Sequence, residues 1–287
     1  VAENAKIFSL LILILGVSPI LAPTVGSYVV AAFGWPMVFT VLAVVTTFIL
    51  GIVILWLPES KGADPTVSLK PKPIITGYKT VIKKPQFTTY AFAGAIASAG
   101  LFAYLAGSPF VFMELYDVSE QQYGWIFALI AAGLIGSSQL NNVILKRYSS
   151  AQIIRIVLLI QSILGLLLVT GIYTGILGLY STIFLMFLFL SCQGFTFPNT
   201  AALAMAPFTT GAGSASALMG ALQMAFGALA SALVGLFFNN TAMPMVVIMT
   251  SCSMFGLLIL MTGRKGVEFR EKQVDLEEQR FEMIEKL

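Results

Sequence analysis

The chain has 287 residues, of which 58% are hydrophobic and only 10% are charged, and its formal net charge is +3. A soluble domain carries about 25% charged residues, so this composition excludes a soluble globular protein and indicates a polytopic membrane protein. The chain contains no histidine, which argues against a metal-dependent hydrolase.

Hydropathy predicts eight membrane-spanning helices, because a helix needs about 20 predominantly apolar residues to cross a bilayer. In chain order the spans are expected at residues 7–33, 36–57, 87–113, 122–145, 151–173, 178–206, 213–238 and 243–262. An even number of spans places both ends of the chain on one side of the membrane. The predicted fold class is therefore an all-α polytopic membrane protein.

The charged residues indicate which side that is. When the eight spans are threaded back and forth across the membrane, all 16 basic residues fall on one side, in or next to the loops and the two end segments. The charged residues on the opposite side are only Glu114, Asp117 and Glu120. The positive-inside rule makes the basic side cytoplasmic, so both termini of this segment are predicted to be cytoplasmic. The net charge thus reports topology, and it gives no indication of nucleic-acid binding.

Two segments are too polar to span. Residues 58–86 hold five prolines among six lysines, and internal prolines break helices, so this part is predicted to be a cytoplasmic linker and not one regular helix. Its lysines either are simply solvated or contact anionic lipid. Residues 263–287 are charged and rich in helix formers, which predicts a cytoplasmic tail helix.

Two neighbouring spans have the most unusual sequences. Polar residues cluster around Gly194 and Pro198, which predicts a broken helix, and Gly213, Gly220 and Gly227 recur every seven residues along the next span. Small residues on one face let membrane helices pack closely. A broken polar helix beside a close-packing helix is typical of transporters, although glycine and proline are common in membrane helices generally.

No Asp, Glu, Lys or Arg lies near the middle of any span. This excludes an intramembrane aspartyl pair and a proton relay within these eight spans, and there is no nucleotide-binding Gly-x-x-x-x-Gly-Lys-Ser/Thr loop. An enzyme and a metal site are therefore not expected. Uncharged polar side chains remain, and they either bond one helix to another or line a substrate cavity. The candidate cavity residues are Gln193, Phe197, Asn199, Gln223, Met219, Phe226, Gln139 and Tyr104.

Two stretches resemble a known family. Residues 16–27 (GVSPILAPTVGS) and 33–39 (FGWPMVF) resemble the antiporter motif of the major facilitator superfamily. Residues 193–205 (QGFTFPNTAALAM) and 212–223 (AGSASALMGALQ) are similar to the tenth and eleventh helices of Bcr/CflA-type multidrug:proton antiporters.

The resemblance implies a major-facilitator-type bundle that starts near the family's fifth helix, with eight of its twelve transmembrane helices present. Residues 1–57 would then form the last two helices of the N-terminal bundle, and residues 87–262 the C-terminal six-helix bundle. In the family the antiporter-motif helix packs against the C-terminal half. The small and bending residues for that packing are Gly16, Pro19, Ala22, Pro23 and Gly26.

The implied function is proton-coupled efflux of drugs or other small amphipathic molecules across the plasma (inner) membrane. The proton gradient would supply the energy without a cofactor, and the proton-binding acid would lie in the missing N-terminal helices. The expected partners are a small-molecule substrate, the lipid bilayer and those missing helices. Two alternatives remain open: a truncated, non-transporting membrane protein that binds a partner or lipid, and an importer of a small metabolite on the same fold.

Overall fold

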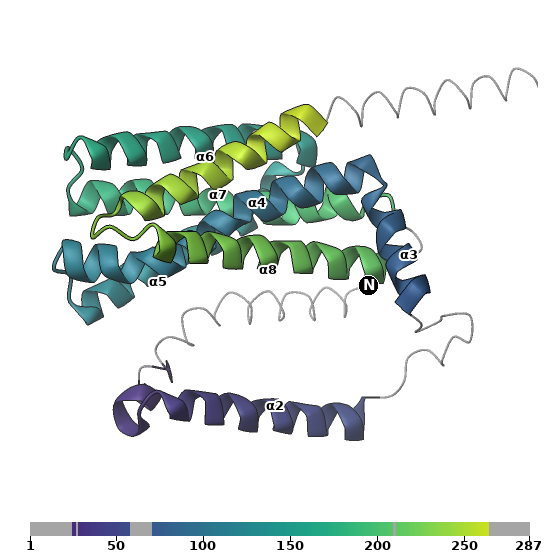
Figure 1. Cartoon of the computed structure of the whole chain (residues 1–287), viewed down its shortest axis with the longest axis horizontal. Helices are drawn as coiled ribbons and strands as arrows, with labels where there is room; N and C mark the ends of the chain where they lie inside the picture. The colour runs from purple at the N-terminus through teal and green to yellow at the C-terminus, as the bar shows by residue number, and fades with distance from the viewer. Residues whose placement is uncertain (1–24, 27, 58–70, 209–210, 264–287) are drawn as a thin grey trace, which may run out of the picture. The chain divides into compact units, whose positions relative to one another are not determined.

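The computed structural model describes residues 25–26, 28–57, 71–208 and 211–263. They are almost entirely helical and fall in two compact units, residues 1–70 and 71–287. Seven helices in the described part are long and apolar enough to cross a membrane (Figure 1). The predicted all-α membrane fold is thereby confirmed.

The first unit contributes one complete described helix, α2 (Pro36–Trp56). The described helical residues before it end at Phe33, and the next residue, Gly34, has a φ of +79° that suits a residue without a Cβ. Pro36 occupies the first turn, where its missing N–H has no helical partner to lose. The predicted span 36–57 is confirmed, whereas most of the span predicted at 7–33 lies outside the described residues.

The second unit contains the other six spans, joined by short connections (Figure 1). In chain order its helices are α3 (Pro71–Ile82), α4 (Pro85–Pro109), the π-helical turn η1 (Phe110–Leu115), α5 (Glu120–Ile144), α6 (Ser150–Tyr173), α7 (Leu179–Met205), α8 (Ala212–Leu236) and a final helix, Met243–Gly263. Each long helix begins and ends within a few residues of its predicted span, because the polar gaps that separate the apolar runs are distinct in the sequence.

Short local signals set several of these helix ends. Ser119 and Ser149 each accept a hydrogen bond from the backbone N–H of the glutamine three residues later, and each glutamine side chain accepts one in return. These capping boxes fix the starts of α5 and α6.

A helix within residues 58–86 is not predicted from the sequence. The structure shows α3 over residues 71–82, packed against α8 and α4. Pro71 and Pro73 do not prevent it, because both fall in the first helical turn, where backbone N–H groups have no partner within the helix. Residues 58–70 and the predicted tail helix beyond Gly263 lie outside the described part of the chain.

Two clusters of buried side chains hold the second unit together. One cluster gathers Tyr104, Phe112 and Phe189 near the η1 end of the bundle. The other gathers Phe87, Leu158 and neighbours near α3. Both combine residues from several helices, so they fix how the six spans pack.

Candidate functional site

Helix α7 is the central helix of the second unit. It packs extensively against α4, α5 and α6, and many of its side chains are buried. A polar side chain on such a helix lies inside the bundle, where an unpaired polar group costs several kcal/mol. The partners of these side chains therefore decide what the helix can do.

Two amides on α7 bond it to its neighbours. The Nε2 of Gln193 donates to the backbone carbonyl oxygen of Ala97 on α4 at 2.6 Å. The Nδ2 of Asn199 donates to the Oδ1 of Asn141 on α5, also at 2.6 Å. Gln193 and Asn199 are 4% and 1% exposed. Two of the predicted cavity residues therefore serve as interhelical donors in this conformation.

The carbonyl oxygens of the same two side-chain amides accept no hydrogen bond from the described residues. The Oε1 of Gln193 and the Oδ1 of Asn199 are buried and have no hydrogen-bond partner among the described residues. Gln161 on α6 repeats the pattern, since its Nε2 donates to the Phe189 carbonyl at 3.3 Å while its Oε1 stays unpaired. Each such oxygen can accept a hydrogen bond from a water molecule or a ligand that reaches it.

The predicted break in this helix is wrong. Helix α7 is continuous from Leu179 to Met205 with Pro198 inside it. Gly194 has a different use, because a Cβ there would collide with the Ser137 hydroxyl and the Leu134 carbonyl oxygen of α5. The glycine permits close approach of α7 to α5 and does not interrupt the helix.

The heptad glycines of α8 behave unequally. A Cβ on Gly227 would come within 2.7 Å of the Phe102 ring on α4, whereas no described atom lies within 4 Å of the Cβ positions of Gly213 and Gly220. The Ser231 hydroxyl, one turn beyond Gly227, donates to the Phe102 carbonyl at 3.1 Å. The predicted glycine face therefore contacts α4 through Gly227 alone.

The other candidate cavity residues are not gathered into one pocket of the described structure. Phe197 is 49% exposed and Gln139 is exposed, while Gln223 is partly buried. Phe226 lies edge-on to Phe92, with ring centroids 6.0 Å apart. The two remaining candidates pack into the bundle, Met219 beside the cluster near α3 and Tyr104 within the other cluster.

Most of the antiporter-motif residues lie in the part of the chain that the structure does not describe. Gly16, Pro19, Ala22 and Pro23 lie outside the described residues, and Gly26 is helical. Their packing role stays a prediction.

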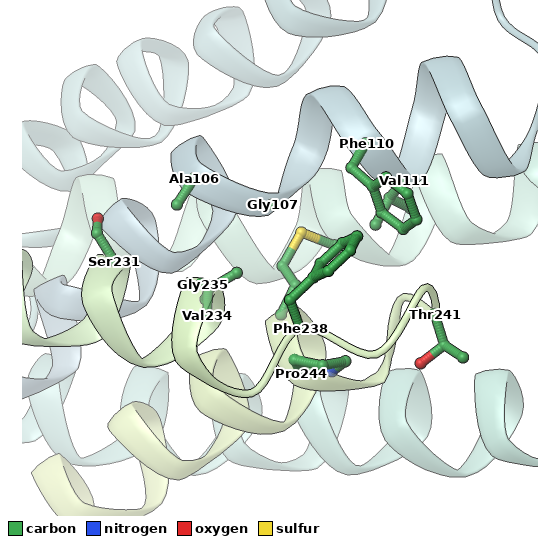
Figure 2. Close-up of a pocket in the computed structure, with 11 residues that line it drawn as sticks. Ala106, Gly107, Phe110, Val111, Ser231, Val234, Gly235, Phe238, Thr241 and Pro244 are labelled. Atoms are coloured by element: carbon green, nitrogen blue, oxygen red, sulfur yellow. The ribbon is translucent and has the colours of Figure 1, made fainter.

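A pocket that the sequence did not indicate lies between the end of α4, η1, the end of α8 and the start of the final helix. Its volume is about 140 Å³, and it is partly open at the surface of the unit. Figure 2 shows the Phe238 side chain extending toward Phe110. The two rings lie edge-on to each other, with their centroids 4.7 Å apart. Pro109, which has no N–H to continue the α-helical ladder, lies directly before the π-helical turn η1 that contributes Phe110 and Val111 to the pocket.

The residues around the pocket are almost all apolar. They are Ala106, Gly107, Phe110, Val111, Ser231, Val234, Gly235, Phe238, Thr241, Pro244 and Met245. Within the described ranges no three His, Cys, Asp or Glu side chains come together as metal ligands. The lining of this pocket is suited to apolar ligands.

The sequence of the chain matches a known protein family. Residues 1–235 match the model of the Major Facilitator Superfamily. The chain is 27% identical over 256 residues to a bicyclomycin resistance protein homolog of Haemophilus influenzae, and 31% identical over 262 residues to the MFS-type transporter YdgK of Bacillus subtilis. Both matches cover 89% of this chain and 64% of the relative.

A third relative is multidrug resistance protein D of Escherichia coli, 28% identical over 217 residues, or 72% of this chain and 51% of that protein. The chain thus spans less than two thirds of the length of each of these relatives.

Proposed function

The chain belongs to the major facilitator superfamily, and from this we propose that it works within a secondary exporter of small amphipathic organic molecules. Two of its relatives are named for resistance to bicyclomycin and to multiple drugs. Outward transport of the drug would account for resistance of that kind.

The observation that carries the proposal is the pair of unused amide oxygens on α7. Gln193 and Asn199 are held by their nitrogens and keep one acceptor each. A helix that only packed would satisfy its contacts with apolar side chains at lower cost. In the proposed cycle, α7 shifts against α4 and α5, and these oxygens then accept hydrogen bonds from the substrate.

The remaining candidates would line the cavity around those oxygens. Phe197 and Gln139 expose their side chains, and Gln223 is partly exposed. Flat aromatic rings and flexible methionines such as Phe226 and Met219 adapt to ligands of varied shape. We assign Tyr104, which is buried, to the floor of the cavity.

Coupling to protons is the finer part of the proposal. A proton carrier needs a titratable group within the membrane, and the described spans carry their acids only near helix ends, at Glu114 and Glu120. The proposal therefore assigns the proton-binding carboxylate to the part of the relatives' length that this chain does not match. That part would also supply the opposing bundle for alternating access.

The proposed location is the plasma (inner) membrane with the basic ends of the helices in the cytoplasm. Because the chain changes side with each span, the basic residues at the helix ends all fall on one side: Lys83, Lys84, Lys146 and Arg147. The acidic residues Glu114 and Glu120 fall on the opposite side. The positive-inside rule supports this orientation.

Ethidium accumulation in an efflux-deficient bacterium tests the proposal. Cells that express the protein at its native length should accumulate less ethidium and grow at higher bicyclomycin concentrations than cells with the empty vector, and a protonophore should abolish both differences. Unchanged accumulation together with faster uptake of a metabolite would favour the importer. Unchanged transport of every compound would favour the non-transporting alternative.

A further inference from the structure

Helix α3 is attached to the bundle along one edge. Val81 is 4% exposed and belongs to the buried cluster near α3. Gly77 faces α8, because a Cβ there would lie 3.9 Å from the Ser214 hydroxyl oxygen. The described residues of this unit leave much of the remaining surface of the helix exposed.

The helix lies where the membrane surface is expected. It ends at Ile82, and the span of α4 begins only three residues later at Pro85. Figure 1 shows α3 crossing the end of the bundle at which α4 and α8 begin, in a direction transverse to theirs. A helix in this position lies along the bilayer surface and not through it.

An apolar strip runs beside the attached edge. Ile74, Ile75 and Ile82 are 43%, 52% and 47% exposed. At 3.6 residues per turn they fall within an arc of about 100°. Large aliphatic side chains on a surface-lying helix enter the boundary between lipid head groups and acyl chains.

A basic strip borders the apolar one. Lys72, Lys79 and Lys83 are exposed, and helical geometry places them within an arc of about 40°. The N–H of Lys83 donates to the Lys79 carbonyl at 3.1 Å, which extends the helical path by one residue. Lys84 is different, since its ammonium lies 5.7 Å from the centre of the Phe208 ring.

No carboxylate in the described residues is near this strip. The acids there are Glu114, Asp117 and Glu120, at the opposite end of α4, whose 25 residues extend over about 37 Å. Three cations on one strip, with no carboxylate near them in the described part of the chain, match an anionic surface by charge. The isoleucine strip beside them favours a membrane surface, because acyl chains lie directly below the lipid head groups.

We propose that α3 binds the head groups of anionic phospholipids through Lys72, Lys79 and Lys83 while Ile74, Ile75 and Ile82 insert below them. The lipid would hold the start of α4 and α8 at a fixed depth in the bilayer. The proposal does not depend on what the protein transports.

Native mass spectrometry of the full-length protein, titrated with phosphatidylglycerol and with phosphatidylcholine, measures this binding directly. The combined variant Lys72→Gln, Lys79→Gln and Lys83→Gln should lose phosphatidylglycerol affinity by at least tenfold, since each surface lysine contributes about fivefold. Its phosphatidylcholine affinity should stay unchanged. The three side chains are exposed, so the helical circular dichroism and its melting temperature should also match the parent protein.

The matched control is Lys146→Gln with Arg147→Gln, which removes two exposed cations from the turn between α5 and α6. It should lower phosphatidylglycerol affinity by a much smaller factor than the triple variant does, because it removes fewer cations and none from α3. Retained preference in the triple variant, or an equal loss in the control, would overturn the proposal. Full competition by soluble glycerol phosphate would also overturn it, because that result describes a phosphate site and not a lipid surface.

Discussion

The Nδ2 of Asn199 lies 2.6 Å from the Oδ1 of Asn141, and this bond joins α7 to α5 across 58 residues of sequence. Both side chains are 1% exposed. The pair is therefore a buried polar contact between two spans. It offers a sharp test of how the bundle is held.

Asn199→Ala should lower the free energy of unfolding by about 0.6–2 kcal/mol, the usual range for an interhelical hydrogen bond in a membrane. A double-mutant cycle with Asn141→Ala, measured by denaturation in mixed micelles, should recover most of that energy as coupling. Asn142→Ala removes the exposed neighbour of Asn141 and should change little. Additive effects of the two substitutions would show that the bond contributes nothing.

Gly227→Leu should prevent α8 from reaching α4, because a Cβ at Gly227 already meets the Phe102 ring at 2.7 Å. Overpacking of this kind costs about 1–3 kcal/mol or more, so the yield of folded protein and its melting temperature should both fall. Gly220 is one heptad before Gly227, and no described atom lies within 4 Å of a Cβ at that position. Gly220→Leu should therefore leave the unit folded. Adding Phe102→Ala should partly restore Gly227→Leu, and equal stability of the two leucine variants would refute the contact.

Gly194→Ala should destabilise the protein although alanine is the better helix former. Its Cβ would collide with Ser137 and Leu134 of α5, and backbone atoms there have little freedom to move. Gly136→Ala is a suitable comparison, since no described atom lies within 4 Å of a Cβ on Gly136. Thermal unfolding of both purified variants measures the difference. A stabilised Gly194→Ala would instead support a flexible break in α7.

Gln223→Ala should change the order of substrate preference more than the amount of protein in the membrane. The side chain is partly exposed on α8, and no interhelical hydrogen bond from it is present among the described contacts, so its loss costs little stability. Accumulation assays with several amphipathic dyes measure the profile, and Ile163→Ala on α6 provides an exposed apolar control. Identical profiles for Gln223→Ala and the parent protein would remove this residue from the proposed cavity.

The spans themselves were predictable from the sequence, and the contacts between them were not. Apolar length and polar gaps define α4 to α8 within a few residues. Pro71 and Pro73 were misleading in residues 58–86, because a proline breaks a helix only beyond its first turn. The same residue type is tolerated within α7 at Pro198, where three neighbouring helices support the chain.

The candidate site shows the same limit. Periodicity marked Gly213, Gly220 and Gly227 alike, but only the packing of Phe102 distinguishes the last of them. Composition identified Gln193 and Asn199 as unusual, whereas their division into a bonded nitrogen and a free oxygen depends on where α4 and α5 lie. The pocket beside Phe238 is lined by three segments far apart in the sequence, so no local pattern predicts it.

Transport by the purified protein tests the proposed function most directly. The protein at its native length would be reconstituted into liposomes with an acidic interior, and ethidium uptake would be followed by fluorescence. The proposal predicts uptake that requires the pH gradient, stops with a protonophore and is competed by bicyclomycin. Uptake no faster than in protein-free liposomes, from protein whose circular dichroism shows it to be folded, would contradict proton-coupled export.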